Sequence, residues 1–115
     1  MSEDHEAALA THLQELRRGT VVLASLAACR SPQYGYSLLN SLAEAGLQTE
    51  ANTLYPLLRR LEKQGLLESE WVTEDPRPRK YYSLTDSGAT VAEALRTEWL
   101  SLTSSLSALW KETGS

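Results

Sequence analysis

ANTLYPLLRRLEKQGLLESEWVTEDPRPRKY, residues 51–81, is the stretch that decides the fold of this chain. Its first part repeats leucines at the i, i+3, i+4 and i+7 spacing of a helix with one buried face: Leu54, Leu57, Leu58 and Leu61. The opposite face carries side chains that donate hydrogen bonds or bear positive charge: Thr53, Tyr55, Arg59, Arg60 and Lys63. A helix of this kind suits the major groove of a nucleic-acid duplex.

After Gly65 the pattern changes to short alternating runs, which predict two strands at residues 66–73 and 80–84. Asp75, Pro76 and Pro78 break the pattern between them. Three cations cluster at this break: Arg77, Arg79 and Lys80. We therefore expect a hairpin whose cationic tip reaches a flanking phosphate or the minor groove.

Base contacts are expected near the start of the helix that carries Leu54 to Leu61, from Thr53, Tyr55 and Pro56. Alternatively, Tyr55 packs in the core and Pro56 only sets the helix angle. Arg59 shares the face of Tyr55, whereas Arg60 points about 100° away, so one arginine is expected to contact phosphate and the other to be a solvated or paired charge. The expected DNA contacts are Thr53, Tyr55, Pro56, Arg59, Arg60, Lys63, Arg77, Arg79, Lys80 and Tyr34.

Apolar spacing predicts three further helices, at residues 4–29, 34–45 and 86–112. Gly19 interrupts the helix at residues 4–29. A glycine inside a helix destabilises it by about 1 kcal/mol relative to Ala, so Gly19 marks a kink or a boundary between two helices. Pro32 prevents its continuation, and Gly46 supplies a left-handed stop after the second helix. Thr49 and Thr85 are candidate N-caps for the helices that follow them.

The helix at residues 34–45 is expected to bury a stripe formed by Tyr36, Leu39 and Ala43 with Leu38 and Leu42. Of its two tyrosines, Tyr36 is the candidate for the core and Tyr34 the candidate for phosphate contact through its hydroxyl group.

The last helix, at 1.5 Å per residue, is roughly 40 Å long and cannot be covered by so small a domain. Its apolar residues recur at nearly heptad spacing, which predicts pairing with a second copy of the chain. The expected dimer contacts are Leu95, Trp99, Leu102, Leu106, Leu109 and Trp110, with Val91 at the start of the series. Trp99 is also a candidate for stacking on a flat hydrophobic ligand.

These elements predict a mainly α fold with a small β-hairpin: a winged helix-turn-helix with a long C-terminal dimerisation helix. We expect a helical acidic extension at residues 1–15, a DNA-binding domain at residues 16–84 and a dimerisation helix at residues 85–115.

The composition of the 115 residues, 42% hydrophobic, is that of a folded domain. Net charge is −4, but residues 51–82 hold six cations and five anions, whereas the remainder holds five cations and ten anions. Binding follows the local patch, although the acidic remainder should weaken non-specific affinity for DNA. The acidic start and the lack of a 20-residue apolar run predict a cytoplasmic protein without a membrane span.

Cys29, the single cysteine, lies in an apolar stretch and excludes an internal disulfide; a buried structural thiol is expected, with a redox sensor as the alternative. His5 and His12 lack a third ligand, so neither a metal site nor a cofactor is expected. No nucleophile with an adjacent base and no phosphate loop is present, so we expect no enzyme activity.

The chain resembles the PadR family of bacterial transcriptional regulators, in particular its short members with one C-terminal helix. The resemblance covers residues 16–110 and rests on these motifs: LRRGT (16–20), YGYSLL (34–39), TLYPLLRRLEKQGLL (53–67), SEW (69–71), RPRKYYSLTDSG (77–88) and the tryptophan-bearing last helix. The acidic residues 2–6, and Glu74 and Asp75 in the hairpin, depart from many relatives. They put an N-terminal DNA contact and a strong hairpin contact in question.

The resemblance implies a homodimer that binds an inverted-repeat operator, usually as a repressor. In some members, aromatic compounds or drugs bind near the dimer interface and release the DNA, which makes a small aromatic effector at Trp99 an expectation here. The acidic balance leaves one alternative open, a winged-helix adaptor that binds another protein without sequence-specific DNA binding.

Overall fold

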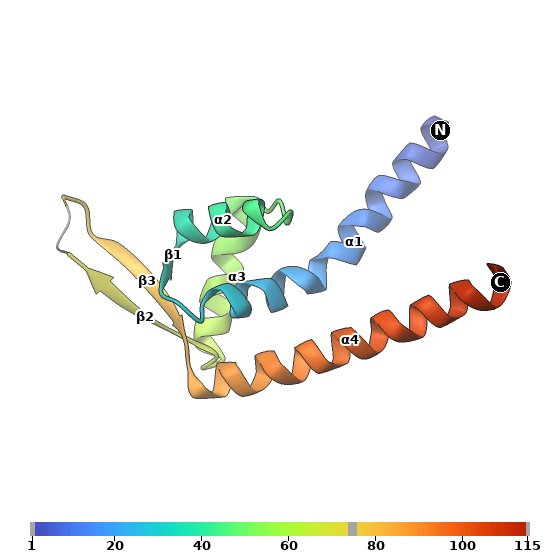
Figure 1. Ribbon diagram of the computed structural model, residues 1–115. Helices are drawn as coiled ribbons and strands as arrows, with labels where there is room; N and C mark the ends of the chain where they lie inside the picture. Colours follow the sequence, from blue (N-terminus) through green and yellow to red (C-terminus); the bar gives the residue numbers. More distant parts are fainter. Residues whose placement is uncertain (1, 74–75, 115) are drawn as a thin grey trace.

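The computed structural model describes residues 2–73 and 76–114 of the chain. Within them it contains these elements in order: α1 (Glu3–Ala28), β1 (Gln33–Tyr34), α2 (Gly35–Glu44), α3 (Ala51–Lys63), β2 (Leu67–Val72), β3 (Arg79–Leu84) and α4 (Asp86–Gly114). Figure 1 shows the β2–β3 hairpin extending to one side of the body, and α1 and α4 extending to the other. This arrangement confirms the predicted winged helix-turn-helix with a long C-terminal helix. Glu74 and Asp75 lie outside the described residues.

The core lies where α1, α2, α3 and the base of the hairpin meet. Its buried residues come from each of these elements: Leu26, Cys29, Leu38, Leu42, Leu54, Leu57, Leu58, Leu61, Leu67 and Tyr82. The four leucines of α3 are those that the helical spacing predicted. Each fully buried leucine contributes about 2 kcal/mol to the stability of the folded state, so this cluster fixes the orientation of α3.

Helices α2 and α3, which form the helix-turn-helix, end in the same way. Gly46 and Gly65 adopt positive φ angles of 89° and 76°, which glycine tolerates without strain. The N–H of Leu47 then donates to the carbonyl of Leu42 at 2.7 Å, and the N–H of Leu66 to that of Leu61 at 3.0 Å. These are Schellman bonds, and they confirm the two predicted glycine stops.

The N-cap prediction for α3 was wrong. Glu50, not Thr49, is the N-cap, and its side chain makes no capping hydrogen bond. The hydroxyl of Thr49 instead donates to the carbonyl of Leu47. Packing of the leucine face, rather than a side-chain cap, therefore determines where α3 begins.

The sheet has three antiparallel strands in the order β1-β3-β2, whereas only two strands were predicted. Strand β1 is two residues long, too short to give a recognisable alternation, and it pairs Gln33 with Tyr82 and Tyr34 with Tyr81. In the hairpin the register runs from Leu67 opposite Leu84 to Val72 opposite Arg79. Strand β1 therefore attaches the start of α2 to the β2–β3 hairpin. We call this hairpin the wing.

The start of α4 is fixed against the end of α3. Thr85 is its N-cap as predicted: its hydroxyl accepts from the N–H of Gly88 at 2.9 Å and donates to the carbonyl of Gly65 at 2.6 Å. Gly88 itself is buried, and a Cβ at this position would lie 2.0 Å from the carbonyl oxygen of Leu66. Only glycine allows α4 to pass this close to the backbone of the preceding loop.

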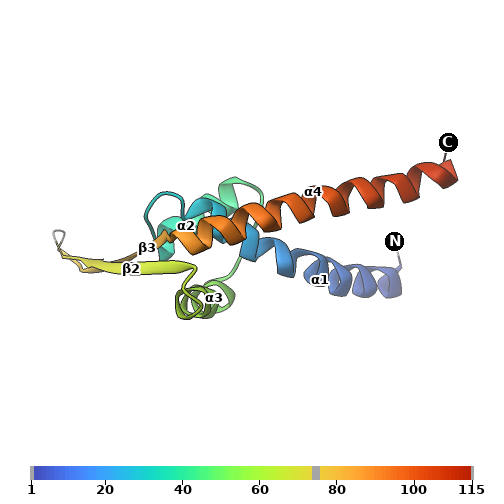
Figure 2. The same ribbon diagram turned by 90° about the horizontal axis from the view of Figure 1, so that it is seen from below.

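Helix α1 is continuous from Glu3 to Ala28, so Gly19 marks no boundary between two helices. Its second half enters the core, and residues 16–23 lie beside α4, whereas its first half diverges from α4 (Figure 1). Both views place the free ends of α1 and α4 on the side of the molecule away from the wing (Figures 1 and 2). Cys29 is fully buried, and desolvation raises the pKa of its thiol to about 11, which confirms a buried thiol. No helix in the described ranges has the length and hydropathy of a bilayer span.

Replacement of Gly88 by Ala should lower the free energy of unfolding by about 3 kcal/mol, because the new methyl group meets a backbone carbonyl that no rotamer change can move aside. Gly19→Ala is the matched control: no atom lies within 4 Å of the position of its Cβ. That change should raise stability by about 1 kcal/mol. Urea unfolding followed by circular dichroism, at one protein concentration, measures both, and equal effects would contradict the tight contact at Gly88.

Candidate nucleic-acid interface

Helix α3 presents a continuous polar face to the surface. All six of its predicted contact residues are exposed: Thr53, Tyr55, Pro56, Arg59, Arg60 and Lys63. Pro56 lies inside the helix and offers no N–H to the carbonyl of Asn52, four residues earlier. Tyr55 is 39% exposed and is therefore not a core residue.

Arg59 and Arg60 line one cavity of about 540 Å³ together with Pro56, Glu62, Lys63 and Lys80. Among the residues that the structure describes, no carboxylate pairs with either arginine. The expectation that one of them is a paired charge therefore finds no partner in this part of the chain. Four cations and one carboxylate surround the cavity, which we call the cationic hollow, and the balance favours an anion.

Lys80 was expected at the wing tip, but it lies on β3 opposite Trp71, with its side chain directed towards α3. Its Nζ pairs with Oε1 of Glu62 at 3.3 Å and lies 5.3 Å from the centre of the Tyr82 ring. Partial burial opposes the charge of Lys80, but Tyr82 and Glu62 outweigh it and raise its pKa. The sequence could not show this pair, because it joins two elements 18 residues apart.

Glu62 is the junction between α3 and both strands of the wing. The hydroxyl of Ser69 on β2 donates to Oε2, while Lys80 on β3 contacts Oε1. The hydrogen bond from Ser69 is the main reason that the pKa of Glu62 is lowered, and Lys80 adds to it. Glu62 therefore holds the wing against α3.

The prediction that Tyr36, at the start of α2, lies in the core was wrong. Tyr36 was expected in the core but is 63% exposed, and Ala43 is exposed as well. The buried stripe of α2 is centred on Leu38 and Leu42, and a residue two places before Leu38 points about 200° away from it. Tyr36 also lines a second cavity, of about 420 Å³, with Arg77 and Pro78.

Tyr34, the predicted phosphate contact, is half-buried in the sheet. Its ring packs edge to face on Tyr81 with centroids 5.3 Å apart, and the guanidinium carbon of Arg79 lies 4.4 Å from its centroid. The aromatic face thus holds Arg79 in place by a cation–π contact. Arg77 is exposed nearer the tip, as expected.

Gly35 lets α2 approach α3 closely. A Cβ at this position would lie 2.5 Å from Cε1 of Tyr55. The ring of Tyr55 therefore rests on the backbone at the start of α2, which fixes its orientation while leaving its edge exposed. The YGY motif at residues 34–36 was the available signal, since a glycine between two aromatic residues suggests a close approach.

A further hollow, of about 380 Å³, lies between α3, the start of α2 and the wing; we call it the helix–wing hollow. It is lined by Tyr34, Gly35, Tyr36, Tyr55, Leu58, Arg59, Trp71, Pro78, Arg79, Lys80 and Tyr82. None of these residues is acidic. Trp71 was not among the predicted contact residues.

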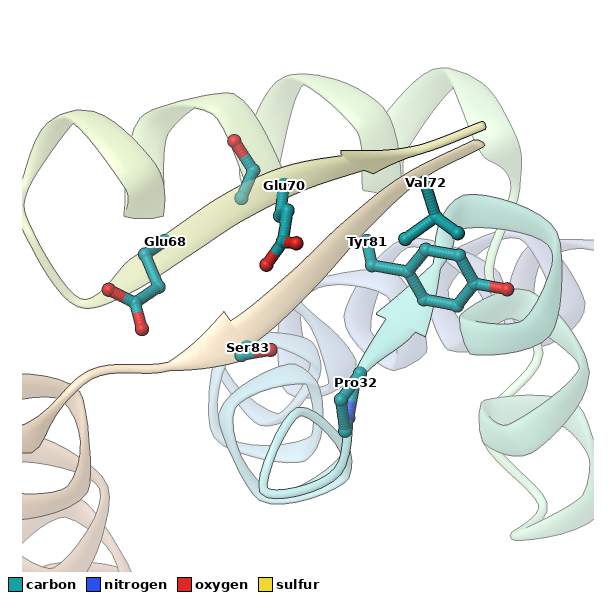
Figure 3. Close-up of a pocket in the computed structure, with 7 residues that line it drawn as sticks. Pro32, Glu68, Glu70, Val72, Tyr81 and Ser83 are labelled. Atoms are coloured by element: carbon teal, nitrogen blue, oxygen red, sulfur yellow. The ribbon is translucent and has the colours of Figure 1, made fainter. Parts of the chain in front are cut away.

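Two acidic residues of the wing that the structure describes, Glu68 and Glu70, lie on its other face. Strand alternation places Glu68 and Glu70 opposite Ser83 and Tyr81, on the side of β2 away from Ser69 and Trp71. Figure 3 shows both glutamates with Tyr81, Ser83 and Pro32 around a cavity of about 530 Å³. No group of three or more metal-binding side chains occurs in the described ranges.

Helix α4 carries the predicted apolar stripe, and the stripe is uncovered. Side-chain exposure rises along it from 38% at Leu95 to 78% at Trp110; the members between them are Trp99, Leu102, Leu106 and Leu109. Trp99 and Leu95 also line a cavity of about 380 Å³ with Leu16, Gly19, Thr20, Val22 and Leu23 of α1. We call this the α1–α4 hollow.

Comparison with known proteins gives consistent results. Residues 22–94 match the sequence profile of the transcriptional regulator PadR-like family. A transcriptional regulator from Mycobacterium tuberculosis is 38% identical over 77 residues, which is 66% of this chain and 72% of the relative. The crystal structure of a PadR family regulator from Eggerthella lenta is 45% identical, with a TM-score of 0.88 over 94% of this chain and 96% of the other. A PadR-like transcription factor from Bacteroides fragilis is 32% identical, with a TM-score of 0.71 over 86% of this chain and 98% of the other.

Glu62→Gln should lower the free energy of unfolding by on the order of 1 kcal/mol at pH 7, because it weakens a charged link that is only partly buried. Since folding lowers the pKa of Glu62 from its ordinary value of 4.5, its contribution is present above that pH and is lost as pH falls through the folded pKa. The difference between wild type and variant should therefore shrink below about pH 4.5.

Urea unfolding between pH 7 and pH 3 provides the measurement. Ser69→Ala is the companion variant, because the hydroxyl of Ser69 is the main cause of the lowered pKa of Glu62. It should show a loss in the same direction with the same pH dependence. A wild-type advantage that stayed constant over the whole range would rule out the link.

Proposed function

The chain belongs to the PadR-like family of transcriptional regulators, DNA-binding proteins rather than enzymes, and we propose that it acts as a homodimeric repressor on an inverted-repeat operator. The observation that carries the proposal is the exposed polar and cationic face of α3 beside the cationic hollow. A helix of 13 residues that is anchored by one leucine face can lay the other in a major groove about 12 Å wide.

We assign the start of α3 to base contacts and its second half to phosphate. Thr53, Tyr55 and Pro56 occupy the first half of the helix, whereas Arg59, Arg60 and Lys63 follow along the cationic hollow. From the wing, Arg77 lies nearest the tip, and Arg79 is pre-positioned by Tyr34. Lys80 contributes charge, but its pair with Glu62 makes it mainly a positioning residue.

The homodimer is proposed from the apolar stripe of α4. An exposed row of leucines and tryptophans on one helix is more hydrophobic surface than an isolated monomer normally presents to water. A twofold arrangement would cover both copies with one interface and place the two α3 helices in successive major grooves about 34 Å apart.

The proposed division into parts follows the predicted ranges, with one refinement. Residues 16–84 would form the DNA-binding unit and residues 85–115 the dimerisation helix. Helix α1 runs without a break across the boundary at residue 15, so the acidic residues 2–6 are held at a fixed distance from α3 rather than on a flexible arm.

We also propose that a small aromatic effector binds in the α1–α4 hollow. Its lining is apolar apart from Thr20, and Trp99 offers an indole face to a flat ligand. Such a ligand would release the operator only if it binds more tightly to a dimer whose two heads are separated wrongly for DNA.

Arg59→Ala should weaken binding to a duplex from the region upstream of the gene by about tenfold, and it should reduce the dependence of log K on log salt. Both protomers carry the change, so the slope should fall by about 1.8. The measurement is fluorescence anisotropy with labelled upstream and scrambled duplexes at several salt concentrations. Arg96→Ala, which removes an exposed arginine of α4 paired with Glu93, is the control and should leave the slope unchanged. Wild-type protein that binds no duplex at low salt would instead favour a winged-helix adaptor.

Leu106→Glu should convert the dimer to a monomer, because it places two charges against each other in the apolar stripe. Light scattering after size-exclusion chromatography at micromolar concentration reports the mass. Ser104→Glu adds the same charge about 160° away around the helix and should remain dimeric. A monomeric wild type would contradict the proposed homodimer, and a dimeric Leu106→Glu variant would place the interface elsewhere.

A further inference from the structure

Trp71 has no role in the core and none in the contacts assigned so far. It lies on β2 directly opposite Lys80, and 62% of the residue is exposed. An exposed indole forgoes most of the stabilisation that its burial would provide, so a partner that covers it gains that energy. The question is which partner reaches this position.

The surroundings of Trp71 combine aromatic rings with positive charge. It lines the helix–wing hollow with Tyr36 and Tyr55 from the helix-turn-helix and with Arg59 and Arg79 from either side. The acidic residues Glu68 and Glu70 lie on the opposite face of the same strand. The hollow therefore offers apolar and cationic contacts side by side, and none of its described lining residues is a carboxylate.

The geometry of a duplex determines what would enter this hollow. A helix in the major groove and a wing at the adjacent minor groove are separated by one sugar–phosphate strand, since that strand forms the wall between the two grooves. This strand alternates anionic phosphates with largely apolar deoxyribose rings. The hollow between α3 and the wing presents the matching alternation of cations and aromatic rings.

We propose that the indole of Trp71 packs on a deoxyribose of the strand that passes between α3 and the wing, an inference that rests on the proposed DNA-binding function. The contact is independent of base sequence and releases no counterion. It therefore adds affinity for DNA without changing the dependence of log K on log salt, which we call the salt slope. It also fixes how deeply the DNA strand enters the hollow between the phosphate contacts on either side.

Two variants test this contact in the full-length dimer. Trp71→Ala should weaken binding to the upstream duplex by about tenfold at every salt concentration, with the salt slope unchanged, whereas Trp71→Phe should retain most of the affinity. Thermal unfolding of both should stay close to wild type, because the side chain is exposed.

Tryptophan fluorescence gives a readout that a structural role would not move. Emission of the wild type should change on addition of unlabelled duplex. Trp71→Phe should lose this change while it still binds the labelled duplex, and Arg96→Ala, which keeps all three tryptophans, should retain it. If the wild type binds the duplex but Trp71→Ala binds equally well, or if Trp71→Phe keeps the fluorescence change, the inference is wrong and the proposed function stands. A salt slope reduced as in Arg59→Ala would also overturn it, since the effect would then be a displaced cation. A wild type that binds no duplex would overturn the proposed function and the inference together.

Discussion

The direction in which α4 leaves the body depends on the contact between Gly88 and the carbonyl of Leu66. That carbonyl also accepts the N–H of Thr85 at 3.1 Å, and the hydroxyl of Thr85 reaches back to Gly65. Since Gly65 and Leu66 directly follow α3, the helix proposed to face DNA and the helix that carries the apolar stripe share one rigid junction. Ser69 and Lys80 extend it into the wing through Glu62. The helix-turn-helix, wing and α4 start therefore behave as one body.

Strand alternation explains how a chain with a net charge of −4 presents a surface suited to an anion. Successive residues of β2 point to opposite faces, which separates Glu68 and Glu70 from Trp71. Glu62, the carboxylate among the described residues that line the cationic hollow, is engaged by Ser69 and Lys80. The remaining negative charge lies mostly on α1 and α4. Long-range repulsion of DNA then restrains non-specific binding, while the local patch attracts a correctly placed phosphate strand.

Features encoded within a few residues could be predicted from the sequence, and features that depend on distant contacts could not. The leucine face of α3, the stops at Gly46 and Gly65 and the cap at Thr85 each involve residues close together in the chain. The two-residue strand β1, the exposure of Tyr36 and the Glu62–Lys80 pair each require the packed structure. Trp71 was overlooked because its position beside Tyr55 appears only once the wing is folded. Gly88 could have been singled out from the sequence, because a glycine inside a helix lowers its stability and close packing is a common reason for one to be there.

The proposed coupling between effector and operator follows from this rigidity. In the proposed dimer, each body would pivot where its α4 meets the other copy, and the α1–α4 hollow would lie beside that pivot. A rotation of about 10° on an arm of about 20 Å would move α3 by about 3 Å, close to the rise of one base pair, whereas operator binding requires a fixed spacing near 34 Å. A ligand at Trp99 need not alter α3 or the wing at all. It would only have to favour a different angle between two otherwise unchanged bodies, and the stiffness of the Gly88 junction would transmit that angle to the DNA-facing surface.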